Sequence, residues 1–231
     1  MVRCVGEESK TLKGTLSFVF CKNYFIETVQ SVLSSVGINN IEFLSTTLAE
    51  AMYLIDDETR DRIAVVLDVG YITSSFSVIR GDGLIYEKAF DYGGGYITAA
   101  ITQKFGISFE DAEAIKKKVN LGRRTDNHVD VITVEENVYV SVSDLKTIVK
   151  YTLDDLCEKL TEITDNLYFE IPEYVPLMIT GGGISYIRGG KEHLSNRLGC
   201  MVEILKPAVP MLDKPELAST LSLLDLALSQ E

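Results

Sequence analysis

The chain has 231 residues, of which 46% are hydrophobic, and this length suits one large domain or two small ones. Its formal net charge of −12 argues against a nucleic-acid-binding protein or a protein that binds an anionic membrane surface. No apolar run approaches the roughly 18 residues of a membrane-spanning helix, and the N-terminal residues lack the apolar core of a secretory signal.

Few residues of the chain favour metal or disulfide chemistry. With only two histidines, a histidine-based zinc site or catalytic triad is not predicted. The four cysteines have no C-x-x-C spacing, so we expect reduced thiols that serve in packing.

The first part of the chain is predicted to alternate strands and helices. Residues 15–20 alternate imperfectly between apolar and polar side chains and predict a strand. Apolar residues at helical spacing predict a helix that begins at Asn23 and is stopped by Gly37. Residues 41–44 predict a second short strand.

A short helix is predicted next. Thr46 and Thr47 are candidate N-caps, and Glu50, three residues after Thr47, would complete a capping box. Residues 56–62 are strongly charged and are predicted to form a link into the following strand.

The central segment of the chain is an apolar run that ends in a carboxylate. Residues 63–67 are rich in β-branched side chains and predict a fully buried strand, which Asp68 ends and Gly70 breaks. In an α/β protein this is a place for a charge that meets a metal-bound phosphate. An equally weighted alternative is a turn aspartate that accepts hydrogen bonds from nearby amides. Two further strands, 76–79 and 84–90, are predicted to form a hairpin.

A glycine triplet, residues 93–95, precedes the next apolar-periodic segment. It would expose backbone amides at a helix N-terminus, which suits an anion, although a flexible bend is the favoured reading of such a triplet alone. Ser108 is predicted to cap a second helix, on which Glu113 and Lys116 share a face. Such a pair usually lies at the surface. The basic cluster 116–124 suits either a polyanion or the negative end of a helix.

The remaining elements are predicted in chain order. They are a small hairpin of residues 129–133 and 138–142, a long helix capped by Ser143 and running to about Asn166, a buried strand 176–180 that ends in Gly181, Gly182 and Gly183, a helix from 184 to 199, a strand 201–205 and a last helix 216–228. The last helix is apolar without a basic face, so it is predicted to pack and not to anchor the chain in a membrane.

Taken together, these motifs resemble the FtsA family of bacterial cell-division proteins, within the actin/Hsp70/sugar kinase superfamily. The segments that carry the resemblance are Leu48-Ala49, Leu67-Asp-Val-Gly70, Asp91-Tyr-Gly-Gly-Gly-Tyr-Ile-Thr98, Asp111-Ala-Glu-Ala-Ile-Lys116, Ile179-Thr-Gly-Gly-Gly183 and Ser219-Thr-Leu. The resemblance implies an α/β fold, namely a ribonuclease-H-like, actin-like ATPase domain with an inserted small α+β subdomain. Residues 1–60 would be a remnant of a first actin-like domain and 61–231 the second, with the insertion at about 91–170.

The resemblance also implies ATP and Mg²⁺ as cofactors and a role for each matching residue. Asp68 would be the catalytic carboxylate that orients the magnesium ion through water. The implied nucleotide-binding residues are Gly70 and Thr73 at the phosphates, Gly93 and Gly94 along the cleft, Glu113 and Lys116 beside the ribose and base, and Gly181, Gly182 and Gly183 in the adenosine loop. A glycine allows the backbone to approach a nucleotide closely.

The chain departs from the family pattern in three ways. Nothing matches the first phosphate loop, and the C-terminal membrane helix is missing, so a truncated or shortened form is expected. Tyr71 and Ile72 stand where relatives usually carry glycine, and Ser75 replaces a usual aspartate. The Tyr71–Ile72 pair should crowd a triphosphate and stiffen the loop.

By this resemblance, the chain binds nucleotide with weak or absent ATPase activity and links a tubulin-like division filament to the membrane. It would self-associate into actin-like filaments, bind no nucleic acid, and reach the membrane only through a segment missing here. The full-length form would be cytoplasmic, at the inner face of the cell membrane. One alternative is a degenerate nucleotide-free scaffold, which Tyr71 and Ile72 favour. Another is a superfamily kinase or phosphohydrolase, which would need a substrate-specific base and a first phosphate loop.

Overall fold

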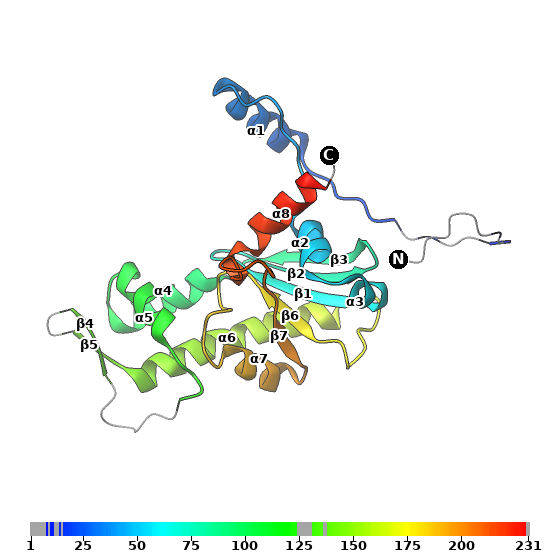
Figure 1. The fold of residues 1–231 in the computed structure, drawn as a ribbon. Helices are drawn as coiled ribbons and strands as arrows, with labels where there is room; N and C mark the ends of the chain where they lie inside the picture. The colour runs from blue at the N-terminus through cyan, green and yellow to red at the C-terminus, as the bar shows by residue number, and fades with distance from the viewer. Residues whose placement is uncertain are drawn as a thin grey trace.

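A mixed sheet of five strands forms the centre of the protein (Figure 1). In this computed structural model, residues 8, 10, 11, 14, 16–123, 131–135 and 138–229 are described. The strands are β1 (Ala64–Val69), β2 (Ser74–Arg80), β3 (Gly83–Phe90), β6 (Leu177–Thr180) and β7 (Val202–Ile204). Their order is β3-β2-β1-β6-β7, with β1 to β3 antiparallel and with β1, β6 and β7 parallel. The hairpin predicted for residues 76–90 and the buried strands predicted at 63–67 and 176–180 are confirmed.

Helices cover both faces of this sheet. Val65, Leu67 and Val69 share one core with residues of α4 (Gly94–Phe105), α6 (Val142–Asp165) and α7 (Gly190–Leu198). Ala64 and Val66 face the other side, where α2 (Thr46–Leu54) packs on them and α8 (Ala218–Leu228) packs on α2. Figure 1 shows α2 and α8 above the sheet and α6 and α7 beneath it. Because side chains alternate along a strand, Asp68 belongs to the α2 side.

A smaller unit lies beyond one end of the sheet. It contains α5 (Phe109–Lys118), packed on α4, and the two-stranded pair of β4 (Val131–Glu135) and β5 (Val138–Ser141). The long helix α6 runs from this unit to the underside of the sheet (Figure 1). Residues 124–130 and 136–137, which include parts of the predicted hairpin and of the basic cluster, lie outside the described residues.

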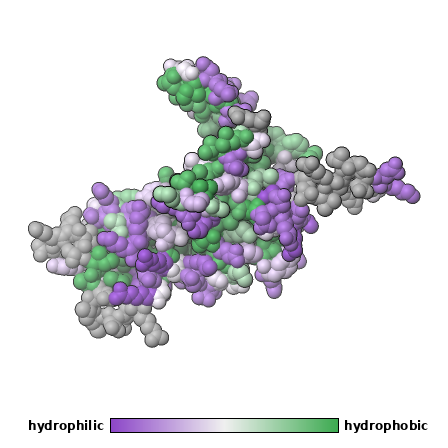
Figure 2. Space-filling view, viewed as in Figure 1, coloured by the Kyte–Doolittle hydropathy of each residue, from purple (hydrophilic) through white to green (hydrophobic). Residues whose placement is uncertain are grey.

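The N-terminal part confirms one predicted helix and corrects two predicted strands. Helix α1 (Asn23–Ser35) forms as its periodicity predicts, but it projects from the body and has no buried residue (Figure 1). Figure 2 shows hydrophobic surface over α1 and α8. Residues 16–20 and 41–44 form no strand, because within the described residues no neighbouring strand pairs with them.

The N-caps of two helices differ from the prediction. The Ser45 hydroxyl accepts a hydrogen bond from the Leu48 amide at 3.2 Å and caps α2, so Thr46 and Thr47 lie inside the helix. Ser141, and not Ser143, caps α6. An N-cap residue has extended backbone and directly precedes the first helical residue. Ser45 and Ser141 have this backbone conformation and precede α2 and α6 directly.

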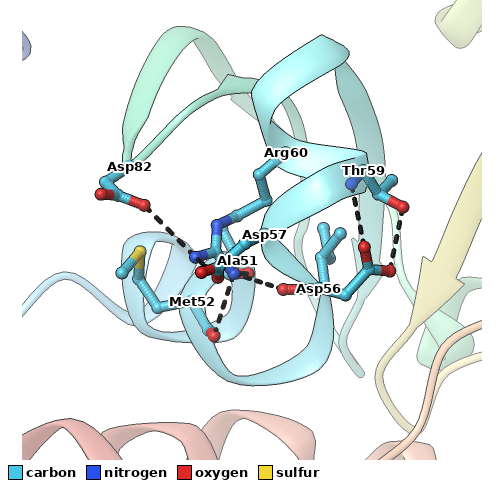
Figure 3. Close-up of polar contacts among 8 residues, drawn as sticks. Ala51, Met52, Asp56, Asp57, Thr59, Arg60 and Asp82 are labelled. Carbon is cyan, nitrogen blue, oxygen red and sulfur yellow. Dashed lines mark hydrogen bonds and ion pairs between the residues drawn. The ribbon is translucent and has the colours of Figure 1, made fainter. Parts of the chain in front are cut away.

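The charged link is itself a short helix, α3 (Asp57–Arg62), built around a buried arginine (Figure 3). The Arg60 guanidinium is buried and donates to the carbonyl oxygens of Met52 and Ile55 at the C-terminal end of α2. It also pairs with Asp82 in the β2–β3 turn at 3.2 Å. Since a helix C-terminus favours a cation, Arg60 ties α2, α3 and the hairpin together.

The last two helices begin later than predicted. Turns occupy residues 181–189 before α7, and a 3-10 turn (Pro215–Leu217) precedes α8. None of the described helices combines the length and the apolar character that crossing a membrane requires.

Candidate functional site

The candidate site lies where the parallel strands β1 and β6 end side by side. Asp68 pairs in register with Thr180 of β6. Among the described residues, the half-buried Asp68 carboxylate has no hydrogen-bond or ion-pair partner, and burial raises its pKa. The buried hydroxyl of Thr180 likewise has no partner in the described part of the chain. Two unsatisfied oxygen groups therefore lie together at one end of the sheet.

Three glycine loops meet at this end. The Gly183 amide donates to the Val69 carbonyl oxygen at 2.7 Å, and the Gly94 amide donates to the Gly70 carbonyl oxygen at 2.9 Å. A Cβ atom on Gly94 would lie 2.6 Å from the carbonyl oxygen of Gly183. Gly181 has a φ of +84°, and a Cβ atom there would overlap the Asp68 carboxylate. These positions need glycine because backbone packs directly on backbone.

The amides at the start of α4 are already engaged. Gly94 and Gly95 donate to the carbonyl oxygens of Gly70 and Tyr71, at 2.9 and 2.7 Å, and the Tyr96 amide donates back to Gly93. Anion binding, the less favoured interpretation of the glycine triplet, would need free amides, but those of Gly94 and Gly95 donate to the neighbouring loop. By contrast, the amides of Ile72 and Gly182 have no acceptor among the described residues.

Lys116 is buried and joins α5 to this junction. Its Nζ atom donates to the Gly94 carbonyl oxygen and the Thr98 hydroxyl, both at 2.8 Å, and pairs with Glu113 at 2.7 Å. Burial lowers the pKa of Lys116, against the effect of Glu113. Burial alone would raise the pKa of Glu113, but hydrogen bonds from Lys116 and Thr98 outweigh it and lower that pKa. The pair is thus not the surface couple that its spacing predicts, because Lys116 is buried and Glu113 is partly buried.

Tyr71 covers this lysine. Its ring centroid lies 5.5 Å from the Lys116 Nζ atom, and the Tyr186 ring lies 5.8 Å away. The Tyr71 ring also packs edge-on against Phe109 at 6.3 Å. An aromatic side chain therefore lies over Lys116 where α4 and α5 meet.

The sequence analysis missed Glu50 as a site residue. Its side chain is only 2% exposed, and its carboxylate accepts a hydrogen bond from the Ser219 hydroxyl of α8 at 2.5 Å. Burial, and then the negative charge of Asp68, raise the pKa of Glu50 to about 7. The available signal is a carboxylate among the apolar residues of a predicted helix, but a glutamate three residues after Thr47 also fits a capping box.

The structure brings the sequence-predicted residues into one region. Asp68, Gly70, Gly93, Gly94, Gly181 and Gly183 touch through the loops, the carbonyl oxygen of Thr73 accepts a hydrogen bond from the Gly70 amide at 3.0 Å, and Lys116 and Glu113 connect through Gly94. Gly182 is exposed beside Glu216. Oxygen groups of the kind that Asp68 and Thr180 supply suit a hard cation such as Mg²⁺. The residues therefore fit a magnesium-bound phosphate.

Comparisons with known proteins agree with one another on the fold. The family model described as "Type IV pilus assembly protein PilM" matches residues 22–138. The cell division protein FtsA of Enterococcus faecalis (strain ATCC 700802 / V583) is 30% identical over 169 residues, which are 69% of this chain and 38% of that protein. FtsA of Enterococcus hirae is 24% identical over 209 residues, which are 87% of this chain and 46% of that protein. The chain thus spans less than half the length of these relatives.

Two solved structures show a similar fold. The PilM-PilN type IV pilus biogenesis complex has a TM-score of 0.66 and 21% identity, over 86% of this chain and 56% of that chain. MreB 5 of Spiroplasma citri bound to AMPPNP has a TM-score of 0.69 and 13% identity, over 91% of this chain and 66% of that chain.

Proposed function

The chain belongs to the family described as type IV pilus assembly protein PilM and has an α/β actin-like fold, and we propose that it acts as an FtsA-like protein of bacterial cell division. The matches to FtsA proteins at 30% and 24% identity support this role. In the proposed role it links a tubulin-like division filament to the membrane from the cytoplasmic side and self-associates into actin-like filaments. The proposal does not name any of the described helices as the segment that attaches to the membrane.

We propose that the site at Asp68 binds ATP with Mg²⁺. The observation that carries this proposal is the Asp68 carboxylate, which has no partner in the described part of the chain, at the meeting point of three glycine loops. Asp68 would hold the magnesium ion through water, and the exposed loops of Gly70, Thr73 and Gly182 would approach the phosphates. The ion, when bound, would neutralise phosphate charge. Glu113 and Lys116 would border the ribose and base.

We also propose a division of the chain into domains, which follows from its resemblance to FtsA proteins. Residues 61–231 would form the second actin-like domain, and about 91–170 would be its inserted subdomain, which would meet the division filament. Residues 1–60 would belong to the first domain. Within residues 1–60, α2 and the residue after it would pack on the second domain through Ala51 and Ile55, which share a core with Ala64 and Val66.

A second candidate function is a nucleotide-free actin-like scaffold. It is favoured by the Tyr71 ring over Lys116 and by the use of the Gly94 and Gly95 amides within the fold. In this candidate, the glycine loops serve only to join β1, β6 and α4.

Calorimetric titration of the chain with ATP, with and without Mg²⁺, tests the proposal. We expect a dissociation constant of about 10–100 μM that depends on Mg²⁺, because Tyr71 crowds the cleft. Asp68→Asn should remove the Mg²⁺ dependence, and Asp225→Asn, an exposed carboxylate on α8, should leave it unchanged. Absence of any binding would favour the scaffold, and a sub-micromolar constant would contradict the crowding of the loop.

A further inference from the structure

A hollow lies under the sheet, at the end away from Asp68. Val65 of β1, Phe76 of β2 and Leu177 of β6 line its floor, and the segment after α6, residues 167–175, forms its wall. Its volume is about 550 Å³, within the range of small-ligand and peptide-anchor pockets. In Figure 1 the wall is the yellow segment between α6 and β6. We call this hollow the α6-end pocket.

The rim of the α6-end pocket carries only negative charge. Asp165, Glu170 and Glu173 are exposed there, and among the residues that the structure describes no lysine, arginine or histidine lines the pocket. None of these three carboxylates has a hydrogen bond or an ion pair with another residue in the described ranges. Asp165 is also the last residue of α6, whose last turn contains no basic residue. A helix C-terminus favours a cation, so this acidic end lacks its natural counter-charge.

Two exposed tyrosines lie on the wall segment, although neither lines the pocket and the Tyr168 hydroxyl donates to the Ile85 carbonyl oxygen of β3 at 2.9 Å. Tyr168 and Tyr174, on the wall segment, are 80% and 73% exposed. Tyrosine is enriched at protein interfaces, and its ring face attracts lysine and arginine. The apolar floor and three carboxylates that have no partner in the described ranges together define the chemistry of an occupant.

We propose that the α6-end pocket binds a short basic peptide segment of a partner protein. A bulky apolar side chain of that segment would enter between Val65, Phe76 and Leu177, and flanking lysine or arginine side chains would meet Asp165, Glu170 and Glu173. Charge complementarity singles out this occupant, because an acidic or neutral segment would leave the rim charges uncompensated.

The α6-end pocket is separate from the proposed nucleotide site at Asp68. Val65 points to the α6 side of the sheet, whereas Asp68 belongs to the α2 side and lies at the other end of the strand. Binding at the α6-end pocket therefore needs no nucleotide, and its test does not depend on the proposed ATP site.

The absence of tryptophan from the chain provides a clean assay. The probe is the peptide acetyl-Lys-Trp-Leu-Lys-Arg-amide, whose tryptophan emission shifts to the blue on burial. We expect a saturable blue shift with the intact chain. Thr164→Phe, an exposed position on α6 that lines the pocket, should plug it and weaken binding at least about tenfold. Thr147→Phe is the matched control, because Thr147 is exposed on the same helix and its hydroxyl also donates to a backbone carbonyl.

A second variant tests the charges without altering the pocket. The pair Glu170→Gln and Glu173→Gln should weaken binding by up to about tenfold at low salt, and added salt should remove this difference. The proposal is overturned if the wild-type chain produces no shift, if Thr164→Phe binds as wild type does, or if acetyl-Glu-Trp-Leu-Glu-Glu-amide binds equally well. Concentration-dependent dimerisation that Thr164→Phe abolishes would instead assign the pocket to a second copy of the chain.

Discussion

The Gly183 amide donates to the Val69 carbonyl oxygen at 2.7 Å, across the ends of two strands far apart in the chain. The same carbonyl group lies 2.7 Å from the position that a Gly183 Cβ atom would occupy. The loop after β6 is thus held against the loop after β1 by main chain alone. The end of β1 that carries Asp68 is therefore held in place by this contact.

Gly183→Ala should destabilise the fold. Its Cβ atom would also overlap the carbonyl oxygen of Gly70, and neither backbone segment can move without breaking a strand end. We expect a loss of about 2–4 kcal/mol in the free energy of unfolding, measured by urea denaturation. Gly122→Ala is the control, because the nearest atom to its Cβ would be Asn120 Oδ1 at 3.6 Å, and it should change stability little. Equal stability of the two variants would contradict the close packing described.

The sequence predicted the junction of Asp68 with the glycine loops for a physical reason. A buried β-branched run that stops at a carboxylate and a glycine has few alternative structures, and a parallel partner strand brings its own terminal glycines to the same edge. The acceptors of the glycine amides could not be predicted from the sequence. Whether Gly94 and Gly95 bind an anion or the Gly70 loop depends on contacts between distant segments.

Burial of charged residues was the main feature that local patterns missed. Glu113 and Lys116 have the spacing of a surface pair, and Arg60 lies in a run that resembles a solvated link. Both cations are buried because they satisfy carbonyl groups, Gly94 in one case and the end of α2 in the other. No local periodicity encodes those acceptors. The strand predicted at 41–44 does not form, because within the described residues no neighbouring strand pairs with this segment.

Arg60→Lys should cost about 2–4 kcal/mol of unfolding free energy. The guanidinium reaches Met52, Asp57 and Asp82 together, and a lysine ammonium cannot span these acceptors (Figure 3). Arg62→Lys is the matched control, because its ion pair with Glu58 is exposed and should contribute less than about 0.5 kcal/mol. Urea denaturation of both variants measures the difference, and a similar small loss in both would show that the buried arginine is dispensable.

Tyr71→Gly should strengthen nucleotide binding if the cleft takes ATP. Removing the ring uncovers Lys116 and restores a flexible loop next to Gly70. We expect the dissociation constant for Mg-ATP to fall by about tenfold, which corresponds to about 1.4 kcal/mol. Phe109→Leu, which removes only the outer ring of the pair, should have a smaller effect in the same titration. An unchanged affinity would count against the crowding argument.

The buried Glu50 should make stability depend on pH. Its pKa is about 7 in the folded chain against a reference value of 4.5, so between these pH values the folded chain keeps a proton that the unfolded chain has lost. The contribution of Glu50 to the free energy of unfolding should therefore be most favourable at or below about pH 4.5. It should fall by about 3 kcal/mol as the pH rises to 7.

Glu50→Gln should remove this fall, because glutamine has no proton to lose and its amide oxygen can still accept from Ser219. Asp68→Asn should reduce it, since the charge of Asp68 is the second cause of the raised pKa. Urea denaturation of each variant across this pH range measures the slope, with the exposed Glu162→Gln as control. A slope that survives in Glu50→Gln would assign the pH dependence to other groups. A slope that Asp68→Asn leaves at its full size would mean that burial alone raises the pKa of Glu50.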